Sequence, residues 1–100
     1  MSHPVDLATF SAQVGQVFHV GENAVPLVLL GVRELPRPMK ADGTPLNPRE
    51  SFSLLFKGPL VSFLPQGTYR FSNETLGELE VFIVPVGKES DGYHYEAVFN

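Results

Sequence analysis

The segment that decides the fold is E-L-E-V-F-I-V-P-V-G-K-E-S-D-G-Y-H-Y-E-A-V-F, residues 78–99. In residues 78–86, Leu79, Val81 and Ile83 fall on one face of a strand, and a period of two also places the apolar residues of 93–99 on one face, as is typical of a half-buried β-strand. Asp91-Gly92 lies between these runs and is a strong signal for a hairpin turn. We therefore predict two antiparallel strands. One face of the second strand carries Tyr93, Tyr95, Ala97 and Phe99.

Four further runs of β-branched and aromatic residues precede this hairpin, at residues 16–20, 26–33, 50–57 and 68–72. Gly and Pro separate them, mostly over short loops, so we expect antiparallel pairing, because a parallel pair needs a crossover of a dozen residues or more. A single open sheet of this size would expose one apolar face. The predicted fold is mainly β: a six-stranded antiparallel small barrel or two-layer sandwich with one short N-terminal helix.

The predicted helix begins after Asp6, a good N-cap residue, and carries Leu7, Phe10 and Val14 on one side. The run at residues 26–33 has apolar side chains on both faces. We expect the helix to cover one of these two faces, so that the strand is buried on both sides.

The length of 100 residues predicts one compact domain over residues 1–100, because such a chain has room for one hydrophobic core. Hydrophobic residues make up 43% and charged residues 18%, a balance that favours a folded chain over a disordered one. The sequence contains no cysteine, which excludes disulfides, thiolate zinc sites, iron–sulfur clusters and cysteine nucleophiles.

The first residues lack the basic and apolar regions of a secretory signal peptide. The most apolar run, residues 24–32, is far shorter than the roughly 20 residues that cross a bilayer as a helix. We therefore expect no membrane span and, by default, a cytoplasmic protein, with export by a signal-independent route left open.

The formal net charge of -4 and the pI near 5.2 lack the basic excess that binds phosphates, so we expect no nucleic-acid partner. The charge is divided unevenly, since residues 1–72 carry +1 and residues 73–100 carry -5. Residues 34–49 form a long proline-rich loop without a strand pattern. The basic residues gathered in and beside this loop are Arg33, Arg37, Lys40 and Arg49.

We interpret this loop either as a solvated connection or as an arm that docks on a partner. The second candidate surface is the polar face of the strand at residues 78–86, where Phe82 and Val84 stand among acidic residues. If the last two strands are neighbours, Glu78, Glu80 and Glu96 form an acidic strip beside that apolar pair. An ordinary solvated sheet face with one exposed aromatic residue is the alternative.

Catalytic and metal-binding patterns are weak. His94 and Glu96 share one strand face but no H-x-H or H-x-x-x-H pair or dense ligand cluster accompanies them. Serine and histidine occur without a nucleophile elbow, and there is no phosphate-binding glycine loop. We therefore assign no catalytic residue, no metal ligand and no cofactor.

Four motifs of the second half carry a family resemblance: F-S-L-L-F-K-G-P at 52–59, L-P-Q-G-T-Y at 64–69, L-G-E-L-E-V-F-I-V-P-V-G at 76–87 and Y-E-A-V-F-N at 95–100. The chain resembles a family of small bacterial single-domain proteins of unknown function. The resemblance implies no activity, cofactor or catalytic residue, and it suggests an accessory role near phage-tail-like or adhesin proteins.

From these observations we expect a non-enzymatic protein-interaction or accessory module that binds another protein or a second copy of itself. The alternative is a small-ligand or metal-binding β domain that uses His94 and Glu96 or the mouth of a barrel.

Overall fold

The structure is a computed structural model that describes residues 6–36, 39–44 and 51–99. These residues form one helix and six strands, as the sequence predicts. In chain order these are α1 (Leu7–Ser11), β1 (Val17–Val20), β2 (Val25–Glu34), β3 (Phe52–Gly58), β4 (Gly67–Asn73), β5 (Gly77–Glu89) and β6 (Gly92–Phe99).

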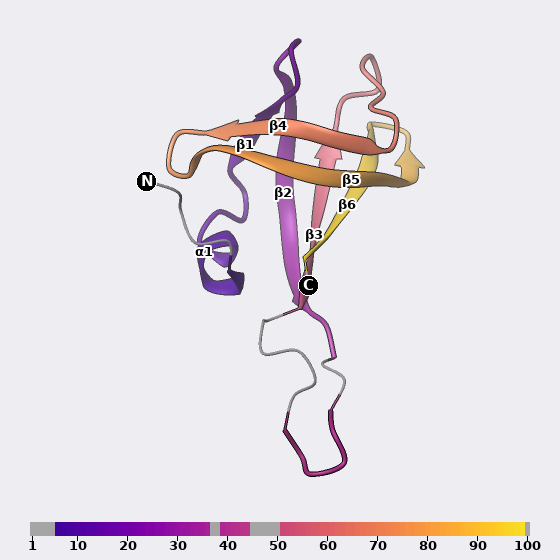
Figure 1. Ribbon diagram of the computed structural model, residues 1–100. Helices are drawn as coiled ribbons and strands as arrows, with labels where there is room; N and C mark the ends of the chain where they lie inside the picture. The colour runs from indigo at the N-terminus through magenta and orange to yellow at the C-terminus, as the bar shows by residue number, and fades with distance from the viewer. Residues whose placement is uncertain (1–5, 37–38, 45–50, 100) are drawn as a thin grey trace.

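The six strands form a closed barrel in the order β1-β2-β3-β6-β5-β4, so each strand pairs with two neighbours. Every pairing is antiparallel, which confirms the predicted architecture and selects the barrel over the sandwich. β4 and the first part of β5 run across the directions of β2 and β3 in Figure 1. β5 connects the two groups of strands, because its first part pairs with β4 and its last part pairs with β6.

The barrel closes along a short seam between β1 and β4. Only His19 with Ser72 and Val20 with Phe71 are paired there. One more hydrogen bond extends the seam, donated over 2.9 Å by the Gly21 N–H to the Arg70 carbonyl. β4 therefore reaches beyond its partner, and β1 does not cover the edge at residues 67–69.

The core fills the barrel with side chains from all six strands, among them Phe18, Leu27, Phe56, Phe71 and Ile83. Three residues outside the strands extend it, and one of them is Leu76 in the turn before β5. Phe10 of α1 is 1% exposed, and its ring lies 6.0 Å from that of Phe52 and 5.4 Å from that of Phe99. Leu64, in the connection between β3 and β4, is 8% exposed and donates its N–H to the Tyr95 hydroxyl over 3.0 Å.

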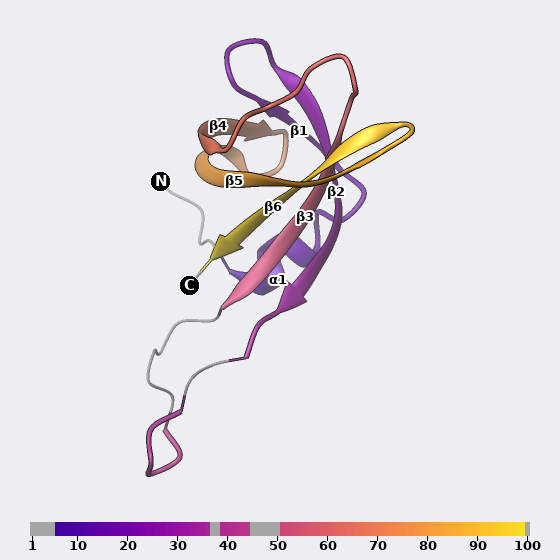
Figure 2. The same cartoon turned by 90° about the vertical axis from the view of Figure 1, so that its right-hand side faces the viewer.

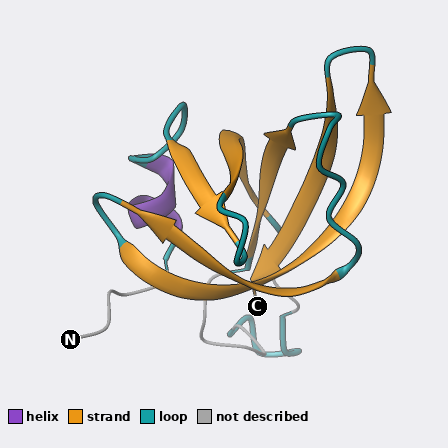
Figure 3. Ribbon diagram, turned by 90° about the horizontal axis from the view of Figure 1, so that it is seen from above, coloured by secondary structure: helices purple, strands orange, loops and turns teal. Residues whose placement is uncertain are grey.

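The helix is shorter than predicted. Asp6 is its N-cap, as expected, and accepts a 2.7 Å hydrogen bond from the Thr9 N–H. The helix ends at Ser11, and Val14 lies in the following turns with 45% of its surface exposed. Figure 3 shows α1 to one side of the strands.

The expected burial of both faces of β2 is wrong. Leu27 and Leu29 face the core, but Leu30 is 42% exposed on the outer surface. α1 contacts β2 without covering this surface. The register of β2 with β3 shifts between Leu29 and Gly31. Beyond this irregularity Val32 packs against the core, whereas Leu30 lies on the outer surface.

The long connection begins and ends at the barrel. Beyond Glu34, which pairs with Phe52, the Leu35 N–H donates to the Ser51 carbonyl over 2.8 Å. A turn over residues 39–44 lies well away from the strands (Figure 2). No helix among the described residues is long and apolar enough to cross a membrane.

Candidate functional site

The outer face of β5 carries the predicted pair of apolar residues. Strand alternation turns Val81 and Ile83 into the core and Phe82 outward, where 50% of its surface is exposed. Val84 is on the same face and is half-buried. The structure therefore exposes Phe82 as the sequence predicts and partly covers Val84.

The acidic residues follow the same face but do not form one uninterrupted strip. Glu78 and Glu80 precede Phe82 on β5 and are exposed. Arg70 of β4 pairs with Glu80 in the strand register and interrupts the negative charge. Glu96 lies at the other end of the face, next to Val84, because β5 and β6 are neighbours there.

The two described residues of the predicted basic cluster lie on different structures. Arg33 lies at the end of β2 and pairs with Ser53 of β3, so it belongs to the surface of the barrel. Lys40 lies on the projecting turn, where its carbonyl accepts from the Gly43 N–H over 3.0 Å. The remaining two residues, Arg37 and Arg49, lie outside the described residues.

The projecting turn has its own polar network. The Asp42 carboxylate accepts from the backbone N–H of Thr44 over 3.0 Å and from its hydroxyl over 2.7 Å. These hydrogen bonds hold the pKa of Asp42 below its usual value. They favour the charged form of Asp42 and define the shape of the turn.

A surface hollow of about 580 Å³ lies beside the seam between β1 and β4, and no sequence motif predicts it directly. It is lined by Val20, Gly21, Glu22, Asn23, Val25, Leu64, Thr68, Tyr69, Arg70 and Glu80. The short predicted strand at residues 16–20 was the one indirect signal, because a short strand cannot pair along a longer neighbour.

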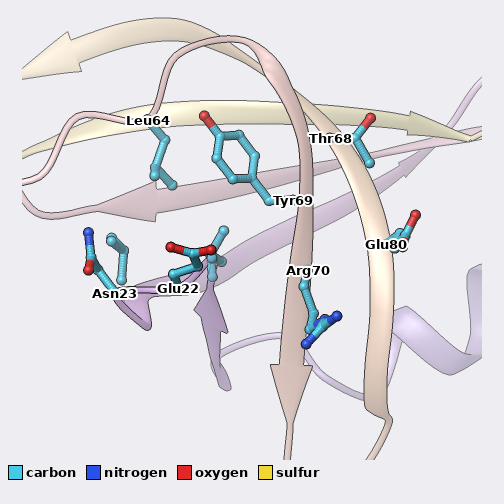
Figure 4. Close-up of a pocket in the computed structure, with 10 residues that line it drawn as sticks. Glu22, Asn23, Leu64, Thr68, Tyr69, Arg70 and Glu80 are labelled. Carbon is cyan, nitrogen blue, oxygen red and sulfur yellow. The ribbon is translucent and has the colours of Figure 1, made fainter.

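The lining of this hollow differs on the two sides of β4 (Figure 4). Leu64 and Tyr69 lie on one side, together with Glu22 from the turn after β1. Arg70 and Glu80 lie on the other side of the strand. The Tyr69 hydroxyl donates to the Pro65 carbonyl over 2.6 Å, which ties β4 to the preceding connection.

The predicted metal candidates do not converge. The His94 Nε2 atom lies 3.1 Å from Glu89 Oε1, at the hairpin between β5 and β6. Glu96 lies further along β6, next to Val84. Within the described part of the chain, no group of three or more His, Asp or Glu side chains is placed to hold a metal ion.

The same hairpin carries an ion pair between Lys57 of β3 and Asp91. The hydrogen bond from Lys57 lowers the pKa of Asp91, and the same bond raises the pKa of Lys57. Both groups are solvent-accessible, so this pair adds little to stability. We infer that this ion pair holds the hairpin between β5 and β6 against β3.

One protein-family model, for a domain of unknown function, matches residues 5–99. The matched range includes α1 and all six strands, so the match concerns the whole barrel. No curated protein and no solved structure matches the chain.

Proposed function

The chain belongs to this family, the domain of unknown function DUF6916, and we propose that its barrel is a non-enzymatic interaction module that binds a partner protein through the outer face of β5. The observation that carries the proposal is the position of Phe82. This ring is 50% exposed on a strand whose inward residues Val81 and Ile83 are fully used by the core. Exposed aromatic residues are frequent anchors of protein interfaces.

The charges around Phe82 define the chemistry of the partner. Glu78 and Glu80 lie before it on the same face, and Glu96 lies beside Val84. Residues 73–100 carry a charge of -5. We therefore infer a partner that presents an apolar side chain flanked by lysine or arginine, because opposite charges favour encounter and correct orientation.

An accessory role in a phage-tail-like or adhesin assembly is part of this proposal, and only the sequence resemblance supports it. The proposal does not include the turn at residues 39–44 as a second binding arm. Arg33 and Lys40 lie on separate structures, and the turn carries the acidic Asp42 beside Lys40.

Site-specific photocrosslinking in the source cells tests the proposal. A photoreactive phenylalanine analogue replaces Phe82, and in a control protein it replaces Val14, which is 45% exposed near α1. We expect discrete adducts from position 82 alone, and the double variant Glu78→Lys, Glu80→Lys reduces them. Equal adducts from both positions, or no adducts from position 82, contradict the proposal.

With a purified partner, Phe82→Ala should weaken binding about 30-fold, the effect of losing an interface anchor worth about 2 kcal/mol. Val14→Ala serves as the matched control, because it removes a comparably exposed apolar side chain elsewhere.

The hollow at the seam favours a second candidate function, the binding of a small ligand. Its volume of about 580 Å³ falls within the range of small-molecule sites, and Leu64, Val20 and Val25 give it apolar walls. A ligand screen by NMR should shift the amide signals of Glu22 and Asn23 in the wild type, and Leu64→Ala should alter this response. A library that leaves these two signals unchanged argues against this candidate.

A further inference from the structure

A second surface lies on the outer side of β3, between β2 and β6. It is a shallow hollow of about 290 Å³, lined by Gly31, Val32, Arg33, Ser53, Leu55 and Glu96. The strand registers explain this composition, because Leu55 lies between Gly31 on one side and Glu96 on the other. Ser53 lies between Arg33 and Val98 in the same way.

This hollow carries one positive and one negative side chain. Arg33 is on β2 and Glu96 is on β6, with β3 between them. Neither forms an ion pair within 4.0 Å with any residue that the structure describes. Both charges are thus available to a molecule that docks on β3.

Apolar side chains surround these charges. Leu55 is 36% exposed at the centre, and Leu30 and Val98 are 42% and 48% exposed nearby on β2 and β6. The hollow exists because residue 31 has no side chain. A Cβ atom built on Gly31 would meet no atom within 4 Å, so the packing of the barrel does not require a glycine there.

We propose that two copies of the chain associate through this surface about a two-fold axis. A surface with one cation and one anion is complementary to itself, because a two-fold rotation brings Arg33 of each copy opposite Glu96 of the other. The same rotation brings the two Leu55 side chains together near the axis. Each hollow then receives an apolar side chain of the second copy.

The charges of the surface on β3 favour a second copy of the chain and not the basic partner proposed for the face of β5. That face is acidic around Phe82, whereas the surface on β3 has balanced charges. Glu96 belongs to both surfaces, but neither Phe82 nor Glu80 lines the hollow, and Arg33 lies on β2, away from the face of β5. Substitutions at Phe82 therefore test partner binding alone, and substitutions at Arg33 test self-association alone.

Sedimentation equilibrium of charge-reversal variants tests the association. We expect the wild type to show twice the chain mass of 11.0 kDa, and Arg33→Glu and Glu96→Arg each to weaken the dimer by about 100-fold or more, because like charges then meet twice. An equimolar mixture of these two variants should dimerise again, because both contacts become complementary in the mixed dimer. A misfolded variant could not give this result.

Two further variants separate the surface from general effects. Glu78→Arg changes the charge equally on β5, outside the hollow, and should leave the dimer intact. Gly31→Val fills the hollow in a monomer that has room for it, and should weaken the dimer at least 10-fold while the far-ultraviolet circular dichroism stays unchanged. A monomeric wild type, or a mixture that stays monomeric, overturns the proposal.

Discussion

Gly92 lies at a close approach between β6 and the backbone of β3. A Cβ atom at this position would lie 2.6 Å from the Gly58 carbonyl oxygen and 3.0 Å from Lys57 Cε. The carbonyl belongs to the backbone of β3 and cannot move without disturbing its pairing with β6. Gly92 does not have a positive φ, so the close packing of the strands, and not the turn, requires a glycine at this position.

We expect Gly92→Ala to lower the free energy of unfolding by about 1–3 kcal/mol, because the added methyl group overpacks the contact between β3 and β6. Gly31→Ala is the control, since nothing lies within 4 Å of its Cβ position, and it should be neutral or stabilising by up to about 1 kcal/mol. Urea unfolding measures both. Equal effects of the two substitutions would show that the close approach at Gly92 is unimportant.

Tyr95 joins the core to the connection between β3 and β4. Its ring is fully buried, and its hydroxyl accepts the Leu64 N–H. Burial raises the pKa of Tyr95 above its usual value. The fold therefore favours the neutral phenol, and this stabilisation is present below about pH 10 and is lost as the pH rises through the raised pKa.

We expect Tyr95→Phe to be less stable than the wild type by about 1–2 kcal/mol at neutral pH, because the buried Leu64 N–H loses its acceptor. Above about pH 10 the difference should shrink, since only the wild type must ionise a buried phenol. Unfolding in urea at several pH values measures the difference. A difference that stays constant to about pH 11 would contradict the role of the hydroxyl.

At the scale of elements, α1 depends on its cap, because a helix of five residues has little stability of its own. Hydrogen bonds from Thr9 hold the pKa of Asp6 below its usual value. The carboxylate thus stabilises the fold above the usual aspartate pKa of about 4, and this contribution is lost as the pH falls through the lowered value.

We expect Asp6→Asn to keep most of the capping and to remove its pH dependence, because an amide oxygen accepts the same bond without titrating. Asp6→Ala should lower the melting temperature at neutral pH more than Asp6→Asn does. Below about pH 4 the wild type should lose stability faster than Asp6→Asn. Parallel melting curves of the two proteins against pH would refute this assignment.

The strands were predictable because their signals are local. The alternation around Tyr95 and Ala97 and the D-G turn fix the last hairpin without reference to the rest of the chain. The burial of β2 was not predictable, since the apolar character of Leu30 does not show whether anything covers it, and the register shift after Leu29 decides that Val32 faces the core. Val14 was misassigned because spacing alone does not show where a helix ends.

The part of the candidate site that depends on one strand was predictable, and the part that depends on strand pairing was not. Phe82 is exposed on its strand because alternation is local, but the meeting of Glu80 with Arg70 needs the pairing of β5 with β4. The two hollows depend on pairings between distant segments, such as Leu55 with Glu96, and no local pattern contains them.

At the scale of the whole molecule, the ring of strands has one weak joint. β3 and β6 pair over seven residues of each strand, whereas β1 and β4 pair over two. Local opening is easiest where few contacts must be lost. We therefore expect the barrel to open locally at the seam before it unfolds globally.

Amide hydrogen exchange measures this difference. We expect the Gly21 amide, which bonds to Arg70 across the seam, to exchange through local opening that depends weakly on denaturant. The amides between β3 and β6 should exchange only through global unfolding. Equal protection at both joints would refute a weak seam.

The strand order also governs how the chain reaches this structure. β1 to β3 and β4 to β6 each pair with sequence neighbours, but both joints between these halves unite distant residues, such as Phe52 with Phe99 and His19 with Ser72. The loss of chain entropy on closing such long loops precedes the contacts that offset it. Folding should therefore take milliseconds to seconds, with hairpins forming early and ring closure limiting the rate.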